Sequence, residues 1–183
     1  HRSGVVAAVA AGVIAVGAAV AFHYFGTSRP ASPLKVGGPA PAFDLPAIGF
    51  DGRVRLADLK GKPTVVGILD TRWPRFLDAV EGLERLNRAL RHRGLAVVGV
   101  FVDPEVEGPA TFVARYPELT FTPALDPGGK GTAAGYGRPA APEIVVIDVR
   151  GTVVARSTDV AAWRTAAFRR TVEPFVEPEK PGL

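Results

Sequence analysis

The sequence predicts an α/β fold in which helices flank a mixed sheet, preceded by one N-terminal transmembrane helix. Continuous apolar runs typical of buried strands alternate with amphipathic helical patterns, as in a sheet with crossover helices. The last two expected strands are joined by a tight turn at Arg150-Gly151, so they are antiparallel and the sheet is mixed. Residues 4–22 carry no charged side chain, which is typical of a membrane span.

The first expected element is a membrane-spanning helix over residues 4–25, about long enough to cross a hydrocarbon core of roughly 30 Å. Tyr24 and Phe25 at its end are aromatic residues of the kind that anchor at the headgroup level. A cleaved signal peptide is the alternative, but its apolar region usually has only about 7–15 residues. Small residues one turn apart let the backbone of another helix approach closely. The candidates for this packing are Ala8, Gly12, Ala15 and Gly17.

The span is followed by a linker, one domain and a tail. Residues 26–38 are rich in Gly, Ser and Pro and are expected to form an irregular tether. The domain is expected over residues 39–176, and residues 177–183 form a proline-containing tail. The domain begins with two short extended pieces around Asp51-Gly52, a turn signal that predicts a hairpin.

The first half of the domain is expected to place one strand beneath one long helix. The apolar run over residues 63–69 predicts a central strand that is covered on both faces. A helix over residues 74–92 follows, with Gly94 as its C-terminal stop. Its apolar stripe has spacings of three and four and consists of Phe76, Val80, Leu83, Leu86 and Leu90.

The second half of the domain is expected to contain shorter elements. They are, in order, a buried strand over residues 95–103, a helix over 109–116, a short strand or extended arm within 119–126 and one or two helical turns within 129–137. An antiparallel hairpin is predicted over residues 143–157. A last helix is predicted over residues 160–172, with Trp163, Ala167 and Phe168 facing inward.

Composition excludes several kinds of chemistry. The 183 residues include no cysteine, which excludes disulfides, thiolate nucleophiles, Cys-ligated zinc, iron–sulfur clusters and covalently attached haem. The histidines, His1, His23 and His92, are far apart, and His92 suits a helix end better than a metal site. We therefore expect no metal and no other cofactor. The net charge of +4 comes from scattered arginines rather than a basic run, so we expect no nucleic-acid partner.

Four local patterns within residues 36–175 resemble one known family. They are the segment GGPAPAFDLPAIGFDGRVRLADLKGKPTVV, the loop ILDTRWPRF, the segment GYGRPAAPEIVVID and the turn VRGTVV. In this order they resemble the thioredoxin-like superfamily, and more narrowly its membrane-anchored TlpA/ResA-type (redoxin) domains. The resemblance implies a thioredoxin-like fold in which Trp73 and Phe76 stand where the family has its Cys-x-x-Cys pair. It also matches Pro142 to the proline that is cis in such folds, with Glu143 where a threonine commonly follows.

The loop that resembles the active site suggests binding rather than redox chemistry. Disulfide exchange needs a thiolate, and this chain has none. Trp and Arg are enriched at interface hot spots, so we predict that a protein-interaction face remains where the chemistry is missing. Its residues are Trp73, Pro74, Arg75, Phe76, Pro142 and Glu143. The alternative is that Trp73 and Phe76 point inward and fill the space of the missing disulfide.

Acid–base catalysis by carboxylates is a further alternative. Asp70, Asp78 and Glu143 are expected near the same loop, and a carboxylate pair can exchange protons with a substrate. No nucleophile or metal site accompanies them, so helix capping and exposure to solvent explain these residues better.

We therefore expect a non-catalytic, redox-inactive accessory or structural subunit of a larger membrane protein complex, for example a respiratory or photosynthetic one. The expected partners are membrane protein subunits and the lipid bilayer. The expected location is the bacterial inner membrane, with the domain on the periplasmic side. The alternative function is a membrane-anchored extracytoplasmic assembly factor or chaperone that binds client proteins transiently.

Overall fold

A computed structural model of the chain describes residues 34–137 and 139–178. The predicted span over residues 4–25, its packing residues Ala8, Gly12, Ala15 and Gly17, and most of the linker lie outside this part of the chain. Among the described residues, no helix is both long enough and apolar enough to cross a membrane.

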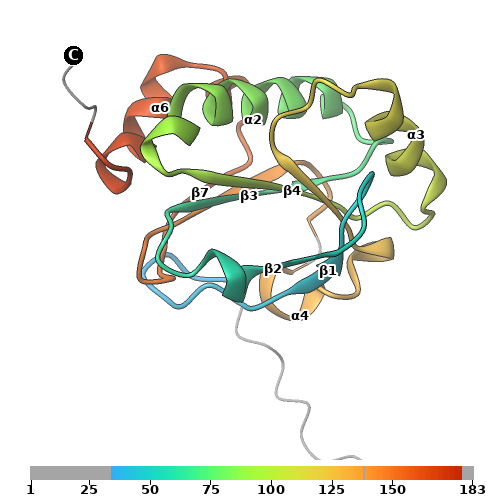
Figure 1. Cartoon of the computed structure of the whole chain (residues 1–183), viewed down its shortest axis with the longest axis horizontal. Helices are drawn as coiled ribbons and strands as arrows, with labels where there is room; N and C mark the ends of the chain where they lie inside the picture. The colour runs from blue at the N-terminus through green and yellow to red at the C-terminus, as the bar shows by residue number, and fades with distance from the viewer. Residues whose placement is uncertain (1–33, 138, 179–183) are drawn as a thin grey trace, which may run out of the picture. The chain divides into compact units, whose positions relative to one another are not determined.

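A five-stranded sheet forms the centre of the domain, in the order β5-β4-β3-β6-β7 (Figure 1). Its parallel strands are β3 (Thr64–Leu69), β4 (Ala96–Phe101) and β5 (Thr122–Leu125). Strand β6 (Glu143–Ile147) pairs antiparallel with β3, and β7 (Val153–Ser157) pairs antiparallel with β6. The mixed sheet predicted from the sequence is therefore confirmed.

Other elements cover both faces of this sheet (Figure 1). The helices on one face are α2 (Phe76–Leu90), α3 (Glu107–Arg115), α5 (Val160–Trp163) and α6 (Ala166–Val172). The other face carries β1 (Asp44–Pro46), β2 (Arg53–Arg55) and α4 (Ala133–Tyr136). Short 3-10 turns lie at Leu56–Leu59 (η1), Arg91–Arg93 (η2), Pro127–Gly129 (η3) and Glu173–Phe175 (η4). The antiparallel pairing of β1 with β2 confirms the hairpin predicted around Asp51-Gly52.

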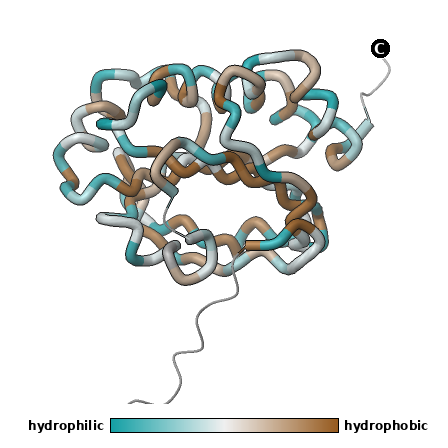
Figure 2. Tube along the Cα trace, turned by 180° about the vertical axis from the view of Figure 1, so that it is seen from behind, coloured by the Kyte–Doolittle hydropathy of each residue, from teal (hydrophilic) through white to brown (hydrophobic). Residues whose placement is uncertain are grey.

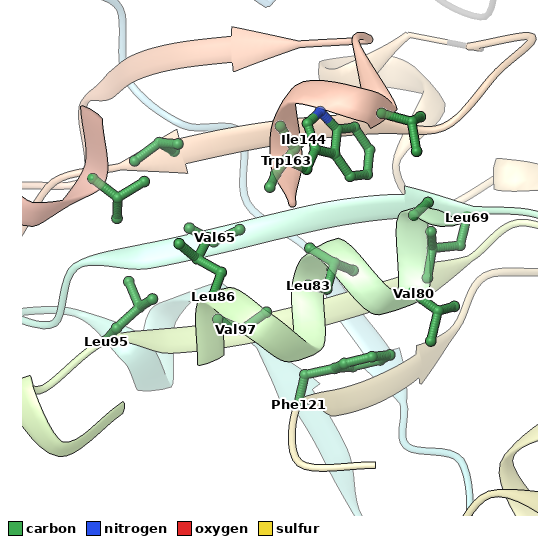
Figure 3. Packing of buried hydrophobic residues seen from close by; sticks show 14 of the residues in the cluster. Val65, Leu69, Val80, Leu83, Leu86, Leu95, Val97, Phe121, Ile144 and Trp163 are labelled. Atoms are coloured by element: carbon green, nitrogen blue, oxygen red, sulfur yellow. The ribbon is translucent and has the colours of Figure 1, made fainter. Parts of the chain in front are cut away.

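The apolar stripe of α2 packs on the sheet as its spacing predicts. Phe76, Val80, Leu83, Leu86 and Leu90 are all buried in one cluster on this face. Figure 3 shows Leu83 and Leu86 of the stripe next to the central strand. Strand β3 is buried along its whole length because its other side chains pack into a second cluster under the opposite face. Figure 2 shows hydrophobic residues concentrated along the central strands.

Gly82 marks the closest approach of α5 to α2. A Cβ added to Gly82 would lie 2.8 Å from the Cβ of Trp163, which is itself buried in the core. Ala is better than Gly inside a helix by about 1 kcal/mol, but overpacking a core typically costs about 1–3 kcal/mol. We therefore expect Gly82→Ala to lower the free energy of unfolding, measured by urea denaturation. A more stable variant would show instead that α5 can move away from α2 without cost.

The last helix differs from its prediction as one continuous element over residues 160–172. The helix stops after Trp163, and Thr165 starts a new one by accepting a hydrogen bond from the Phe168 N–H at 3.1 Å. Threonine is a favoured N-cap because its oxygen satisfies a free N–H of the first turn. Trp163 is buried and Phe168 is half-buried, as predicted, but the break leaves Ala167 exposed.

Candidate functional site

The loop over residues 70–75 joins the carboxyl end of β3 to α2. Asp103, two residues beyond β4, is only 3% exposed and holds this loop from the side. Its carboxylate accepts hydrogen bonds from the Thr71 N–H at 3.1 Å and from the Thr71 hydroxyl. Asp70 accepts bonds from the Arg72 N–H at 2.9 Å and from the Arg72 guanidinium at 2.9 and 2.6 Å. The loop is thus fixed by two carboxylates without any bound partner.

Removing the Asp103 carboxylate tests this arrangement. Asp103→Ala leaves the half-buried Thr71 N–H and hydroxyl without their acceptor, and the loss of a hydrogen bond to a charged group costs about 1.5–3 kcal/mol. We expect the free energy of unfolding to fall by that amount and the amide of Thr71 to exchange hydrogen faster. Glu105→Ala, at an exposed position two residues away, is the matched control. Equal effects of the two variants would show that Asp103 does not hold the loop.

The four loop residues predicted to face a partner lie in different environments. Pro74 and Arg75 are exposed, and Trp73 is half-buried against the second core cluster. Phe76 is buried, with its ring centroid 4.8 Å from that of Phe112, so its side chain fills the core instead of meeting a partner. Arg75 has a φ of 65° and is the only non-glycine residue in the described part of the chain with a positive φ. Such a backbone is costly for a residue with a Cβ and is concentrated at functional loops.

Pro142 and Glu143 do not present their side chains to solvent. Pro142 is buried, and the peptide bond before it is trans, like every other peptide bond between described residues. The resemblance to folds with a cis proline at this position is therefore not matched in bond geometry. Glu143 is buried in β6 and accepts a hydrogen bond from the Arg156 Nε at 2.7 Å. Arg156 also donates to the backbone oxygen of Leu34 at 2.8 Å.

The carboxylates near the loop are each held by arginine. Asp78 lies 3.1 Å from Arg75 and 3.2 Å from Arg164. Hydrogen bonds from Arg72 keep the pKa of Asp70 below its ordinary value, although burial opposes this shift. A carboxylate that stays ionised and paired is a poor general acid. In the part of the chain that the structure describes, no three His, Cys, Asp or Glu side chains are grouped to hold a metal ion.

Two exposed apolar residues beside the loop were missed by the sequence analysis. Leu77, in the first turn of α2, is 61% exposed, and Val106, directly before α3, is 51% exposed. Leu77 falls outside the apolar stripe of α2, so its exposure could have been predicted from the sequence. No sequence pattern predicted that Val106 lies near the loop. The turn that contains Val106 comes close to it because Asp103 and Gly108 lie next to Thr71.

A hollow of about 260 Å³ lies beside Trp73. It is lined by Asp70, Arg72, Trp73, Val102 and Pro104 together with Gly128, Gly129, Gly137 and Pro139. We call the exposed residues Pro74, Leu77 and Val106, the half-buried Trp73 and this hollow the docking face. It combines an aromatic side chain with aliphatic ones. The nearby carboxylates of Asp70 and Asp103 already accept hydrogen bonds from the loop.

Comparisons with known proteins match most of the domain. A sequence model described as the AhpC/TSA family matches residues 36–156. A Chlorobium tepidum protein provisionally named the thiol:disulfide interchange protein DsbE is 25% identical, with a TM-score of 0.65 over 77% of this chain and 94% of that one. The thioredoxin domain of a thiol-disulfide oxidoreductase from Bacteroides vulgatus is 22% identical, with a TM-score of 0.66 over 79% of this chain and 99% of that one. No curated protein matches the sequence. The predicted thioredoxin-like fold is therefore confirmed.

Proposed function

Because the chain belongs to the AhpC/TSA family but contains no cysteine, we propose that it is a redox-inactive member that binds another protein. In this proposal it is a non-catalytic accessory subunit of a larger membrane protein complex. It is anchored in the bacterial inner membrane by residues 4–25, and its domain lies on the periplasmic side.

One observation carries the binding role. Apolar side chains are exposed beside the loop where the family resemblance places its cysteine pair: Leu77 and Val106 are more than half exposed, and Trp73, at one of the two cysteine positions, is half-buried. Exposed apolar side chains that gather at one place on a soluble surface mark interaction sites. Trp is also the residue type most enriched at hot spots. The hydrogen bonds of Asp70 and Asp103 hold the loop in place, which lowers the entropy lost on binding.

The membrane role is supported by the sequence before the domain. Residues 4–25 form an apolar segment long enough to span a bilayer, and residues 26–33 provide a short tether to Leu34. The small residues Ala8, Gly12, Ala15 and Gly17 would suit contact with another membrane helix. Membrane protein subunits are therefore the proposed partners, and respiratory or photosynthetic complexes are the proposed setting.

The stoichiometry of the assembly tests the subunit role. We would tag the C-terminus, extract membranes in mild detergent, and identify the proteins in each native-gel band by mass spectrometry. A subunit is expected to migrate with a fixed set of membrane proteins at a constant ratio. Migration as a free small protein, or with partners at substoichiometric and variable amounts, would contradict the subunit role and favour a transient assembly factor.

A further inference from the structure

The end of the domain opposite the docking face brings together segments that are far apart in sequence. Thr64 begins β3, and its register partners are Ala96 at the start of β4 and Ile147 at the end of β6. The docking face lies at the other end of these strands, beyond Leu69. The segments that precede β3, precede β4 and follow β6 therefore meet at one end, which we call the distal end.

The distal end is rich in exposed positive charge. Its exposed cations are Lys60, Lys62, Arg91 and Arg150, and Arg150 is 80% exposed. Within residues 34–137 and 139–178, Lys60, Lys62 and Arg91 form no ion pair, whereas Arg150 pairs with the buried Asp148 at 3.1 Å. Two exposed acids lie nearby: Asp58 is 3.8 Å from Arg55, and Glu177 lies beside Arg93, to whose backbone oxygen its N–H donates a hydrogen bond at 3.0 Å.

Three of these cations, Lys60, Lys62 and Arg150, line an apolar hollow. A depression of about 210 Å³ is lined by the apolar residues Leu56, Leu59 and Ile147 and by Lys60, Lys62 and Arg150. Val149, at the tip of the β6–β7 turn, is 47% exposed beside it. Cations around exposed apolar side chains suit the boundary between lipid headgroups and acyl chains, where phosphates accept the charges and apolar groups leave water.

The docking face has the opposite charge pattern. Glu105 and Glu107 are exposed on either side of Val106, and the guanidinium groups of Arg72 and Arg75 are occupied by Asp70 and Asp78. Within the described residues, three exposed cations without an ion pair lie at the distal end, Lys60, Lys62 and Arg91, whereas Lys130 is the exposed cation without an ion pair next to the docking face, where Glu105 and Glu107 are also exposed. An anionic surface would attract the distal end and repel the other.

We propose that the distal end binds the surface of an anionic phospholipid bilayer, so that the docking face points away from the membrane toward a partner protein. The inference rests on the proposed membrane attachment, which holds the domain close to a bilayer. Each Lys or Arg near such a surface contributes about 1 kcal/mol. Removing two of them is therefore expected to lower the ratio of bound to unbound domains by about 30-fold.

Single-cysteine labelling of the full chain tests the proposal. The fluorophore attaches only at the introduced cysteine, because the chain has no cysteine of its own. Val149→Cys and Leu77→Cys would each carry a fluorophore, in vesicles that contain lipids with spin-labelled headgroups. With phosphatidylglycerol present, we expect quenching at position 149 and little at position 77. Added salt should relieve it by screening. Equal quenching in pure phosphatidylcholine, or stronger quenching at position 77, would overturn the proposal.

Charge variants identify the groups that bind. Lys60→Gln combined with Lys62→Gln is expected to abolish most quenching at position 149. Lys130→Gln combined with Arg75→Gln, which removes two exposed cations toward the other end, should leave it unchanged. Equal loss in both pairs would mean that only net charge matters and would overturn the assignment of the distal end. Release of the label by millimolar inorganic phosphate at constant ionic strength would show a site for the free anion instead and would also overturn it.

Alkaline carbonate extraction separates this proposal from the proposed function. If carbonate washes the full chain from the vesicles, the membrane anchor fails. The distal end can still be tested by adding the chain to preformed vesicles and measuring the same quenching. If the chain resists extraction but position 149 shows no dependence on anionic lipid, the anchor stands and the lipid-binding inference fails.

Discussion

Phe76→Ala is expected to lower the free energy of unfolding by about 3–5 kcal/mol. The Phe76 ring is buried and packs against the rings of Phe101 and Phe112, at centroid distances of 6.1 and 4.8 Å. Its removal would leave a cavity where the start of α2 meets β4 and α3, and such cavities collapse only partly. Urea denaturation followed by circular dichroism measures the loss.

The neighbouring residue provides the matched control. Leu77 is 61% exposed, so Leu77→Ala is expected to change the free energy of unfolding by no more than about 0.5 kcal/mol. A small effect of Phe76→Ala, close to that of Leu77→Ala, would contradict the placement of Phe76 in the core. It would also restore Phe76 as a candidate for contact with a partner.

Trp73→Ala is expected to weaken association with the partner complex by about 30-fold or more, because truncation of a hot-spot residue typically costs about 2 kcal/mol or more. The measurement is the fraction of the tagged chain that migrates with the complex on a native gel as the detergent extract is diluted. Val149→Ala changes an exposed residue at the distal end and is expected to leave this fraction unchanged.

Trp73 is half-buried, so its truncation also removes contacts within the domain. Leu77→Ser separates the two effects, because Leu77 projects from α2 and contributes little to the core. It is expected to weaken the same association while the unfolding transition stays in place. Retention of the full complex by both variants would show that the docking face is not the contact surface.

The arrangement of the domain could be predicted because local patterns determine it. The stripe from Phe76 to Leu90 placed α2 on the sheet, and the continuous run before Asp70 placed β3 at the centre. The stripe also contained the information that Phe76 is buried. The two interpretations of Phe76, as an interface residue or as a core residue, are separated by this periodicity alone.

Contacts between distant segments could not be predicted in the same way. Glu143 meets Arg156 only because β6 and β7 pair in a particular register with a shift near Val146. Asp103 reaches Thr71 only because β3 and β4 are parallel neighbours whose ends coincide. Interactions of this kind depend on register, which no single segment encodes.

Photo-crosslinking from the docking face tests the central claim most directly. A photoreactive amino acid would replace Leu77 in one variant and Val149 in another, and irradiation of intact membranes would be followed by mass spectrometry of the products. The proposed function predicts one defined protein adduct from position 77 and no such adduct from position 149. Absence of a protein adduct at position 77, or the same set of adducts from both positions, would contradict the claim that this cysteine-free domain binds a partner protein through the docking face.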